Sequence, residues 1–359
     1  MKANLLFLSL SLCAINLIFT QNTVTKIDMI SSNWNLPEGA SFEKFEGRNT
    51  LVLKKGRATL KNLQFTNGSI EVDIYANAKR SFGGIAFRKK ENTMEEVYIR
   101  LHKSNQADAV QYTPIFNNES NWQLYREYQA NVPFRNKEWN TLRIDVLDQI
   151  AVISLNNEKI MTVDQLKTDN IEGAIGVWAL FGARFSNFRI TQKDPSIKVN
   201  TPSVLQVADS GIIRKWNITQ AFSYDVDALS YASFSKEEYT VVPTEVSGLL
   251  PISKFVKKTS SGNFEQNKEN YIVAATNIHS DTASNKLFSF DYSDKIIVYL
   301  NGTPIFRGNN AFRQKGVQYT GHIDINTNTL YLPLKKGKNT LHCVVIDKAN
   351  GWGLIGKIE

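Results

Sequence analysis

Hydrophobic and polar residues alternate with a period of two along most of this chain, and this pattern predicts β-strands. The predicted strand segments are SIEVDIYA (69–76), GGIAFRKK (83–90), EEVYIRLH (95–102), TLRIDVL (141–147), IAVISLNNEKI (150–160), ENYIVAATNI (269–278), DKIIVYLNGTPIF (294–306), TLYLPL (329–334) and NTLHCVVID (339–347). Hairpin turns are expected at 156–158 and at Asn301–Gly302. No long window shows the spacing of an amphipathic helix, so the sequence predicts an all-β fold.

One polar stretch divides these strands into two groups. Residues 192–204, QKDPSIKVNTPSV, contain two prolines and follow the strand-like segment FSNFRI (185–190). The lengths on either side are each normal for a β-sandwich. We therefore expect one domain over residues 21–192, a linker over 193–204 and a second domain over 205–359.

The first twenty residues, MKANLLFLSLSLCAINLIFT, place Lys2 before an apolar run. This arrangement is typical of a secretory signal peptide, and the run is too short to span a bilayer comfortably. We expect an exported protein, periplasmic or extracellular, with no transmembrane segment. Removal of residues 1–20 leaves Cys343 without a disulfide partner, and its apolar surroundings in the sequence predict a buried, inert thiol.

The amino-acid composition excludes few classes of function. The chain has 359 residues, of which 42% are hydrophobic and 21% charged, as in ordinary globular proteins. The net charge of +8 is spread along the chain without a basic block, which gives little support to nucleic-acid binding. An anionic polysaccharide is compatible with this charge but is not implied by it.

The polar faces of the first strands hold the candidate binding residues. Val97, Ile99 and Leu101 share the core face of their strand, so Tyr98, Arg100 and His102 share the other face. The same alternation places Asp73 and Arg88 away from the core. A half-solvated sheet shows similar alternation without any ligand, and this interpretation remains open.

Residues 103–128 are interpreted as a long loop that supplies further candidates. These are Gln111, Tyr112, Trp122, Gln123 and Tyr125. Aromatic faces stack on the apolar faces of sugar rings, and glutamine and arginine side chains hydrogen-bond to sugar hydroxyls. The alternative is that the loop packs its own aromatic side chains over the sheet edge.

The first domain resembles concanavalin A-like, or laminin-G-like, jelly rolls. The resemblance rests on NGSIEVDIYA, GGIAFR and the closing IGVWALFGARFSNFRI, and it extends over nearly all of residues 25–192. It implies a sandwich with a ligand on its concave face, in a fold that hosts lectins, glycosidases, lyases and adhesion modules. The strands are also similar to those of keto-glycoside hydrolases built on this sandwich, although no catalytic set can be placed.

The resemblance also bears on enzymatic activity. Glycosidases of this fold use E-x-D-x-x-E or E-x-D-x-E, but Tyr75 and Ala76 follow Glu71 and Asp73 here, so that chemistry is not expected. Polysaccharide lyases of this fold use arginine, glutamine, histidine and tyrosine side chains. The chain has residues of these types in Arg88, Arg100, His102, Gln111 and Tyr112, and His102, Arg100 and Tyr98 are the catalytic candidates if it is an enzyme.

Residues 205–359 resemble galactose-binding-like jelly rolls through IIRKWNITQAF, SFDYSDKIIVYLNGTPIFRG and the segment that follows LYLPL. Trp216 is predicted to lie in the core, and Tyr319 is an aromatic that a carbohydrate module can expose. Trp352 lies between glycines in NGWG, and both a core and an exposed position are open for it. Asp291, Ser293 and Asp294 carry oxygens that suit structural Ca²⁺, but an exposed acidic turn is the favoured interpretation. No cofactor is expected.

These observations together predict two β-sandwich jelly-roll domains in tandem, as in bacterial exported carbohydrate-active proteins. The leading hypothesis is a carbohydrate-binding protein that holds a polysaccharide or glycan on the concave face of the first sandwich. A lyase or glycoside-cleaving enzyme that uses the arginine, histidine and tyrosine side chains is the first alternative. A cell-surface protein-interaction module is the second.

Overall fold

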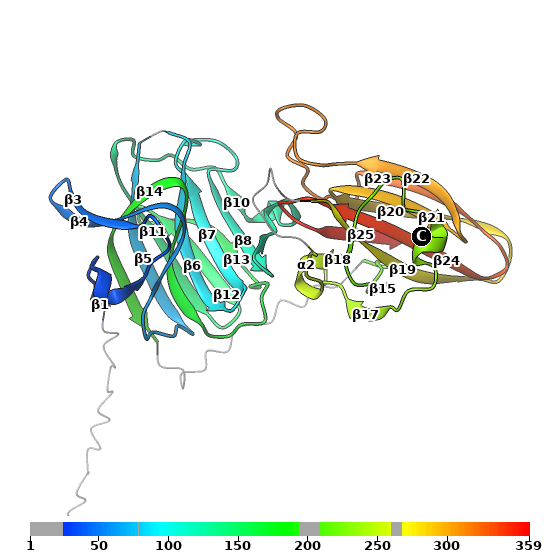
Figure 1. Cartoon of the computed structure of the whole chain (residues 1–359), viewed down its shortest axis with the longest axis horizontal. Coiled ribbons are helices and arrows are strands. Elements are labelled where there is room, and N and C mark those ends of the chain that lie inside the picture. Colours follow the sequence, from blue (N-terminus) through cyan, green and yellow to red (C-terminus); the bar gives the residue numbers. More distant parts are fainter. Residues whose placement is uncertain (1–23, 78, 194–208, 260–267) are drawn as a thin grey trace, which may run out of the picture.

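The computed structural model describes residues 24–77, 79–193, 209–259 and 268–359. The predicted signal peptide and residues 194–204 of the predicted linker lie outside the described residues. Figure 1 shows the described chain as two β-rich bodies side by side along the long axis, which we call the N-terminal half (24–193) and the C-terminal half (209–359). Within these residues no helix has the length and apolar character needed to cross a membrane.

Antiparallel strands make up nearly all the regular structure of the N-terminal half. They are β1 (Val24–Ile27), β2 (Trp34–Asn35), β3 (Ser41–Phe45), β4 (Arg48–Leu60), β5 (Gly68–Ala76), β6 (Phe82–Lys90), β7 (Thr93–Arg100), β8 (Val110–Phe116), β9 (Glu119–Ser120), β10 (Gln129–Ala130), β11 (Glu138–Leu147), β12 (Ile150–Leu155), β13 (Glu158–Val163) and β14 (Ala174–Gln192). Short 3-10 helices cover Ser31–Asn33, Trp122–Leu124 and Arg126–Tyr128. The predicted all-β fold is confirmed.

The strands of the N-terminal half form two layers around one core. Layer A contains β10, β8, β7 and β6 in that order, followed by residues 174–180 of β14 and residues 55–59 of β4. Layer B contains residues 185–192 of β14, followed by β5, β11, β12 and β13. The residues predicted to point inward meet in the core between the layers, among them Val97 and Ile99 from layer A and Ile70 and Val72 from layer B.

Strand β14 belongs to both layers because it changes direction at Phe181 and Gly182. Both residues have positive φ angles, 61° and 92°, and the register with β4 shifts between Leu180 and Ala183. Such an irregularity bends a strand and re-aims its side chains. The bend allows one continuous strand to leave β6 and join β5, which closes the sandwich.

Two further sheets form the C-terminal half. Their strands are β15 (Lys215–Ile218), β16 (Phe222–Ser223), β17 (Thr240–Pro243), β18 (Leu249–Pro251), β19 (Asn270–Ser280), β20 (Ser284–Ser293), β21 (Lys295–Leu300), β22 (Thr303–Asn309), β23 (Asn328–Leu334), β24 (Gly337–Asp347) and β25 (Gly353–Ile358). Two one-turn helices, α1 (Tyr231–Phe234) and α2 (Ile252–Phe255), accompany them. One sheet runs β17–β15–β19–β24–β21–β22 and the other β18–β25–β20–β23, so the predicted hairpin at Asn301–Gly302 is confirmed.

The core of the C-terminal half lies between these sheets and corrects one expectation. Trp216 is 0% exposed, as predicted, and Trp352 and Cys343 are buried beside it. Burial raises the pKa of the Cys343 thiol, in keeping with an inert cysteine. The expected exposed acidic turn is wrong, because Asp291 is 0% and Asp294 4% exposed.

The two halves are joined by residues 119–130, which follow β8 and lie against the C-terminal half. Tyr125 Oη donates to Glu245 at 2.6 Å, Gln123 Nε2 donates to the Thr320 carbonyl at 2.6 Å, and the Ile323 amide donates to the Gln123 carbonyl at 3.1 Å. Trp122 Nε1 donates to Asn350 at 3.2 Å. These bonds fix the relative position of the two halves through backbone and side chains together.

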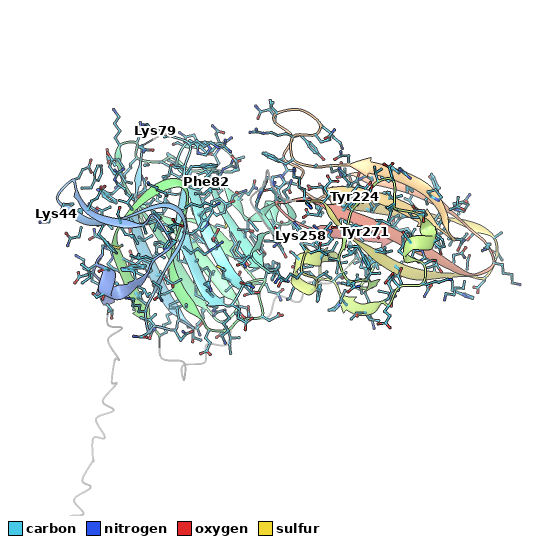
Figure 2. All side chains as sticks on the ribbon, in the orientation of Figure 1. Lys44, Lys79, Phe82, Tyr224, Lys258 and Tyr271 are labelled. Atoms are coloured by element: carbon cyan, nitrogen blue, oxygen red, sulfur yellow. The ribbon has the colours of Figure 1, made fainter. Side chains whose placement is uncertain are left out.

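A buried ion cluster adds to this contact. Lys258 has a side chain only 3% exposed, and it pairs with Asp347 of its own half and with Glu119 of the N-terminal half, the latter at 3.3 Å. Burial lowers the pKa of Lys258, but Asp347 and Glu119 raise it by more, so the ammonium group stays charged. Figure 2 shows Lys258 in the region where the two halves meet.

Lys258→Met should destabilise the protein strongly. The substitution leaves the buried Asp347 without its cation, and loss of one partner of a buried ion pair costs about 3–5 kcal/mol. The exposed neighbour Lys257→Met is the matched control. Urea unfolding of both variants measures the difference, and equal free energies of unfolding would contradict this account of the cluster.

The contact between the halves should also weaken in acid through His322. Burial lowers the pKa of His322 from 6.5 to about 4, and the positive charges of Arg126 and Arg100 act in the same direction. The unfolded chain therefore takes up a proton that the folded chain does not bind, so stability is complete above pH 6.5 and falls as the pH drops toward 4.

His322→Gln should reduce this acid loss of stability, because glutamine does not titrate. The expected difference in the free energy of unfolding between neutral pH and pH 4 is at most about 3 kcal/mol. Denaturant unfolding at a series of pH values measures it, with His279→Gln, at a side chain 74% exposed, as the control. Identical pH profiles for wild type and His322→Gln would exclude the effect.

Candidate functional site

The outer face of layer A, which points away from the core, carries a row of large polar and aromatic side chains. The register of the strands defines this row: Gln129 lies opposite Gln111, Gln111 opposite Tyr98, Tyr98 opposite Gly84, Gly84 opposite Trp178, and Trp178 opposite Arg57. Paired residues of an antiparallel ladder project to the same side. One row of side chains therefore crosses the layer from β10 to β4.

Aromatic rings form the centre of this face. The ring centroids of Trp178 and Tyr98 are 5.2 Å apart, and Phe82 lies 5.9 Å from Tyr98 and 6.2 Å from Trp178. Phe82 also contacts His102 at 5.5 Å. Trp178, Phe82 and His102 are half-buried, so parts of their rings remain accessible to a ligand.

A buried carboxylate borders the aromatic rings on the side of β4. Arg57 donates from Nε and from Nη2 to the same oxygen of Glu96, Oε2, at 3.0 and 2.8 Å. Within the described chain no hydrogen bond is formed by the other oxygen, Oε1. Burial raises the pKa of Glu96 although Arg57 opposes this shift. Glu96 is thus a carboxylate that can accept a proton or a hydroxyl hydrogen bond through Oε1.

A second ion pair borders the rings on the opposite side. Arg100 pairs with Asp108, and its guanidinium carbon lies 5.4 Å from the centre of the Phe82 ring. Arg100 Nε is buried without a hydrogen-bond partner. Burial lowers the pKa of the neighbouring His102, and Arg100 lowers it further, so His102 is neutral near pH 7.

The row ends against the C-terminal half. Gln129 Nε2 is 2.8 Å from His322 Nε2, and the other ring nitrogen of His322 is 2.7 Å from Thr320 Oγ1. Both Arg100 and Asp108 act electrostatically on His322. Beyond β10, the outer face of layer A therefore contacts polar side chains of the C-terminal half, those of His322 and Thr320.

Four of the predicted site residues lie together on this face. They are Tyr98, Arg100, His102 and Gln111, and the Tyr98 hydroxyl donates to Gln111 Oε1. Burial raises the pKa of Tyr98, so its hydroxyl stays protonated. The predicted grouping of a tyrosine, an arginine and a histidine at the end of β7 agrees with the geometry, while their role in binding stays a prediction.

Arg88 and Tyr112 do not share this face. Arg88 is 1% exposed and donates to the Thr66 carbonyl, because its φ of 49° and a register shift between Phe87 and Lys90 turn the side chain inward. Tyr112 lies in strand β8 rather than in a loop, opposite the core residue Val97, and its hydroxyl donates to Glu95 at 2.6 Å. Gln111 is in the same strand, so the predicted loop at these two residues was wrong.

Asp73 belongs to the other side of the sandwich. It projects from β5 on the outer face of layer B, where Arg48, Thr141 and Asn187 donate to its carboxylate at 2.7, 2.8 and 2.8 Å. The sequence showed correctly that it points away from the core. It did not show that β5 and β7 lie in different layers.

Trp122, Gln123 and Tyr125 lie against the C-terminal half rather than on the predicted face. Gln123 is 0% and Tyr125 1% exposed, and Trp122 packs edge-on against His322 at 5.4 Å. The predicted alternative, that this segment packs its own aromatic side chains, is nearer to the structure. Their partners, however, come from the other half of the chain.

Sequence reasoning missed several residues of the face. Trp178 alternates with the core residues Val177 and Ala179, so its outward direction was readable from the period of two. Glu96 alternates with Val97 in the same way. Arg57, Gln129 and His322 had no local signal, because only the register of β4, β10 and the C-terminal half brings them to this face.

Metal ligands are not grouped in the described part of the chain, where no set of three or more histidine, cysteine, aspartate or glutamate side chains is placed to hold an ion. At the suggested calcium position, Asp291 instead accepts hydrogen bonds from Asn310, Asn328 and the Asp324 amide, at 2.7, 3.1 and 2.9 Å. These bonds give the buried carboxylate a structural role.

Comparison with solved structures finds several carbohydrate-related proteins of low similarity. The carbohydrate-binding module CBM66 from Bacillus subtilis is 13% identical with a TM-score of 0.36, covering 44% of this chain and 96% of the module. A putative glycosyl hydrolase from Parabacteroides distasonis is 15% identical with a TM-score of 0.34, covering 45% of this chain and 89% of the hydrolase. At these values the likeness assigns no activity. No curated protein sequence matches the chain.

A family model matches the N-terminal half. Residues 30–191 match the model of the 3-keto-alpha-glucoside-1,2-lyase-like domain. This range contains every strand of the N-terminal half apart from β1 and the last residue of β14. It includes all the residues that the N-terminal half contributes to the outer face of layer A, whereas His322 lies outside it. It also coincides with the part of the sequence that resembles concanavalin A-like sandwiches and keto-glycoside hydrolases. The galactose-binding-like resemblance of residues 205–359 stays a prediction.

Proposed function

We propose that this protein binds carbohydrate on the outer face of layer A. The observation that carries the proposal is the aromatic cluster formed by the half-buried rings of Trp178 and Phe82 with the buried Tyr98, bordered on one side by Arg57 with Glu96 and on the other by Arg100 with Asp108. Sugar rings offer apolar C–H faces that stack on aromatic rings, and hydroxyl groups at the ring edge that need donors and acceptors. This face supplies both.

The arrangement favours a sugar over the other classes of partner. A protein-binding surface is expected to expose a contiguous apolar patch, whereas the apolar rings here alternate with charged and amide groups. Arg57 and Arg100 are each paired with a carboxylate, which reduces the free positive charge available to a polyanion. The match of residues 30–191 to a domain family named for a glucoside also supports a carbohydrate ligand.

Glu96 favours a second candidate function, eliminative cleavage of a keto-glycoside. Hydrolases of glycosides use two carboxylates, but Asp108 is ion-paired with both Arg100 and Lys103, which leaves Glu96, bonded to Arg57 through one oxygen, as the candidate base. Removal of a proton next to a ketone needs one base with a raised pKa, which Glu96 has. The name of the matched family, a 3-keto-alpha-glucoside-1,2-lyase-like domain, supports the same reaction class.

In this reaction Glu96 Oε1 takes the proton from C2 of the sugar, which lies beside the C3 ketone. The electron pair of the C2–H bond forms a C1=C2 double bond, the C1–O bond breaks, and the departing oxygen takes a proton from water. The hydroxide left behind takes the proton from Glu96, which restores the carboxylate and the water. The Arg57 guanidinium lies beside Glu96 and is available to stabilise negative charge on the ketone oxygen. No second carboxylate is needed.

Trp178→Ala should weaken binding of maltohexaose, an α-linked glucose oligomer, by about tenfold or more, as expected for ~1.5 kcal/mol of lost aromatic contact. Titration calorimetry measures the affinity. Tyr331→Ala, which removes an aromatic side chain 74% exposed on β23, is the control and should bind as wild type does. Unchanged affinity in folded Trp178→Ala would place the ligand elsewhere.

Glu96→Gln should abolish cleavage while binding is retained. With para-nitrophenyl 3-keto-α-glucoside, release of nitrophenolate should fall by about 100-fold or more, the usual effect of removing a general base. Asp73→Asn, on the outer face of layer B, is the control for loss of a carboxylate. A wild-type protein that binds maltohexaose but releases no nitrophenolate would reject the lyase and leave a binding protein.

A further inference from the structure

One segment of the C-terminal half extends to the end of the outer face of layer A. Residues 310–324 form the loop, orange in Figure 1, between β22 and β23 at the end of the C-terminal half that faces the N-terminal half. Its contacts with the N-terminal half include His322 with Gln129, Thr320 with Gln123, and Phe312 with Trp122, whose ring centroids are 5.8 Å apart. The segment therefore packs on Gln129, which ends the row, and on the nearby Trp122 and Gln123.

This loop is held firmly at both of its ends. Asp291, fully buried in β20, accepts hydrogen bonds from Asn310 at one end and from the Asp324 amide at the other, at 2.7 and 2.9 Å. Burial raises the pKa of Asp291, and these hydrogen bonds oppose the rise. A buried carboxylate with several donors fixes the backbone around it.

The loop also fits closely against the N-terminal half. Gly321 has a φ of +72°, and a Cβ there would lie 2.5 Å from Gln123 Nε2 and 2.6 Å from the Asn310 carbonyl oxygen. Only glycine allows the backbone at position 321 to lie so close to Gln123 and Asn310. This close packing of the loop sets the next residue, His322, beside Gln129. His322 keeps part of its ring accessible, with Arg100 and Asp108 close enough to affect its charge.

We propose that the C-terminal half completes the binding site, with His322 and Thr320 forming the end subsite that receives the last ring of an oligosaccharide. The inference rests on the proposed function, because it extends the same face. Gln129 and Thr320 bond the two ring nitrogens of His322, so the subsite offers a sugar the accessible part of the His322 ring for contact and the Gln129 and Thr320 side chains for hydroxyl hydrogen bonds. The C-terminal half is then part of the recognition surface rather than a separate accessory module.

The length of the row indicates the substrate class. The path from β10 to β4 passes through β8, β7, β6 and β14, which makes five inter-strand steps. At roughly 4.8 Å per step the row extends over about 24 Å, several times the width of one sugar ring. A linear oligosaccharide lying across the strands reaches from the aromatic cluster to His322, whereas a disaccharide on the cluster does not.

Chain-length dependence of binding tests the inference. Calorimetry with maltose, maltotriose and maltohexaose compares wild type with His322→Ala, and His279→Ala serves as the control for loss of an exposed histidine. His322→Ala should bind maltohexaose about tenfold more weakly, equivalent to 1.4 kcal/mol, and should bind maltose as wild type does. His322→Gln keeps a polar group beside Gln129 and Thr320 and should lose less, which separates recognition from a change in folding.

The outcomes separate this inference from the proposed function. An equal loss for maltose and maltohexaose in His322→Ala, or no loss for either, overturns the role of His322. If Trp178→Ala still weakens binding in that case, the carbohydrate site on layer A stands without the C-terminal half. If wild type binds none of the three sugars, the end subsite fails together with the proposed function.

Discussion

The packing of residues 119–130 against the C-terminal half is the contact on which the rest of the structure depends. These residues leave β8, place Gln123 and Tyr125 in buried positions between the halves, and return to layer A as β10. Because Gln129 of β10 is in register with Gln111 and also reaches His322, the docking of this segment sets where the outer face ends. The buried pair of Lys258 with Glu119 strengthens the same contact.

The chemistry of the outer face follows from which groups the fold leaves accessible. Layer A needs its inner positions for the core, so aromatic and charged residues on the other side are either solvated or available to a ligand. Here the charged side chains are buried or half-buried and paired, with Arg57 neutralising Glu96 through a single oxygen and Arg100 neutralising Asp108. Such pre-positioned polar groups around aromatic rings suit a neutral, hydroxyl-rich ligand, and Glu96 adds the capacity for proton transfer.

The sequence predicted the strands and side-chain directions that depend on residues adjacent in the chain. It missed the contacts between residues that lie far apart in the chain. Alternation identified the strands, the inward Val97 and Ile99, the buried Trp216 and the direction of Tyr98. Alternation placed Arg88 away from the core, which is wrong because a bulge shifts the alternation there by one residue. It also could not show that Asp73 lies in layer B, away from the other candidates. The partners of Trp122 and Asp291 lie far along the chain, so no local pattern indicated that these side chains are structural.

Hydrogen–deuterium exchange with and without maltohexaose tests the central claim most directly, because it reports every segment of the folded chain at once. The account predicts slower exchange in β6, β7 and residues 174–180 of β14, together with residues 310–324 of the C-terminal half. Protection restricted to other regions, such as the outer face of layer B around Asp73 or the hollow of about 610 Å³ lined by Arg214, Asn217 and His279, would contradict it.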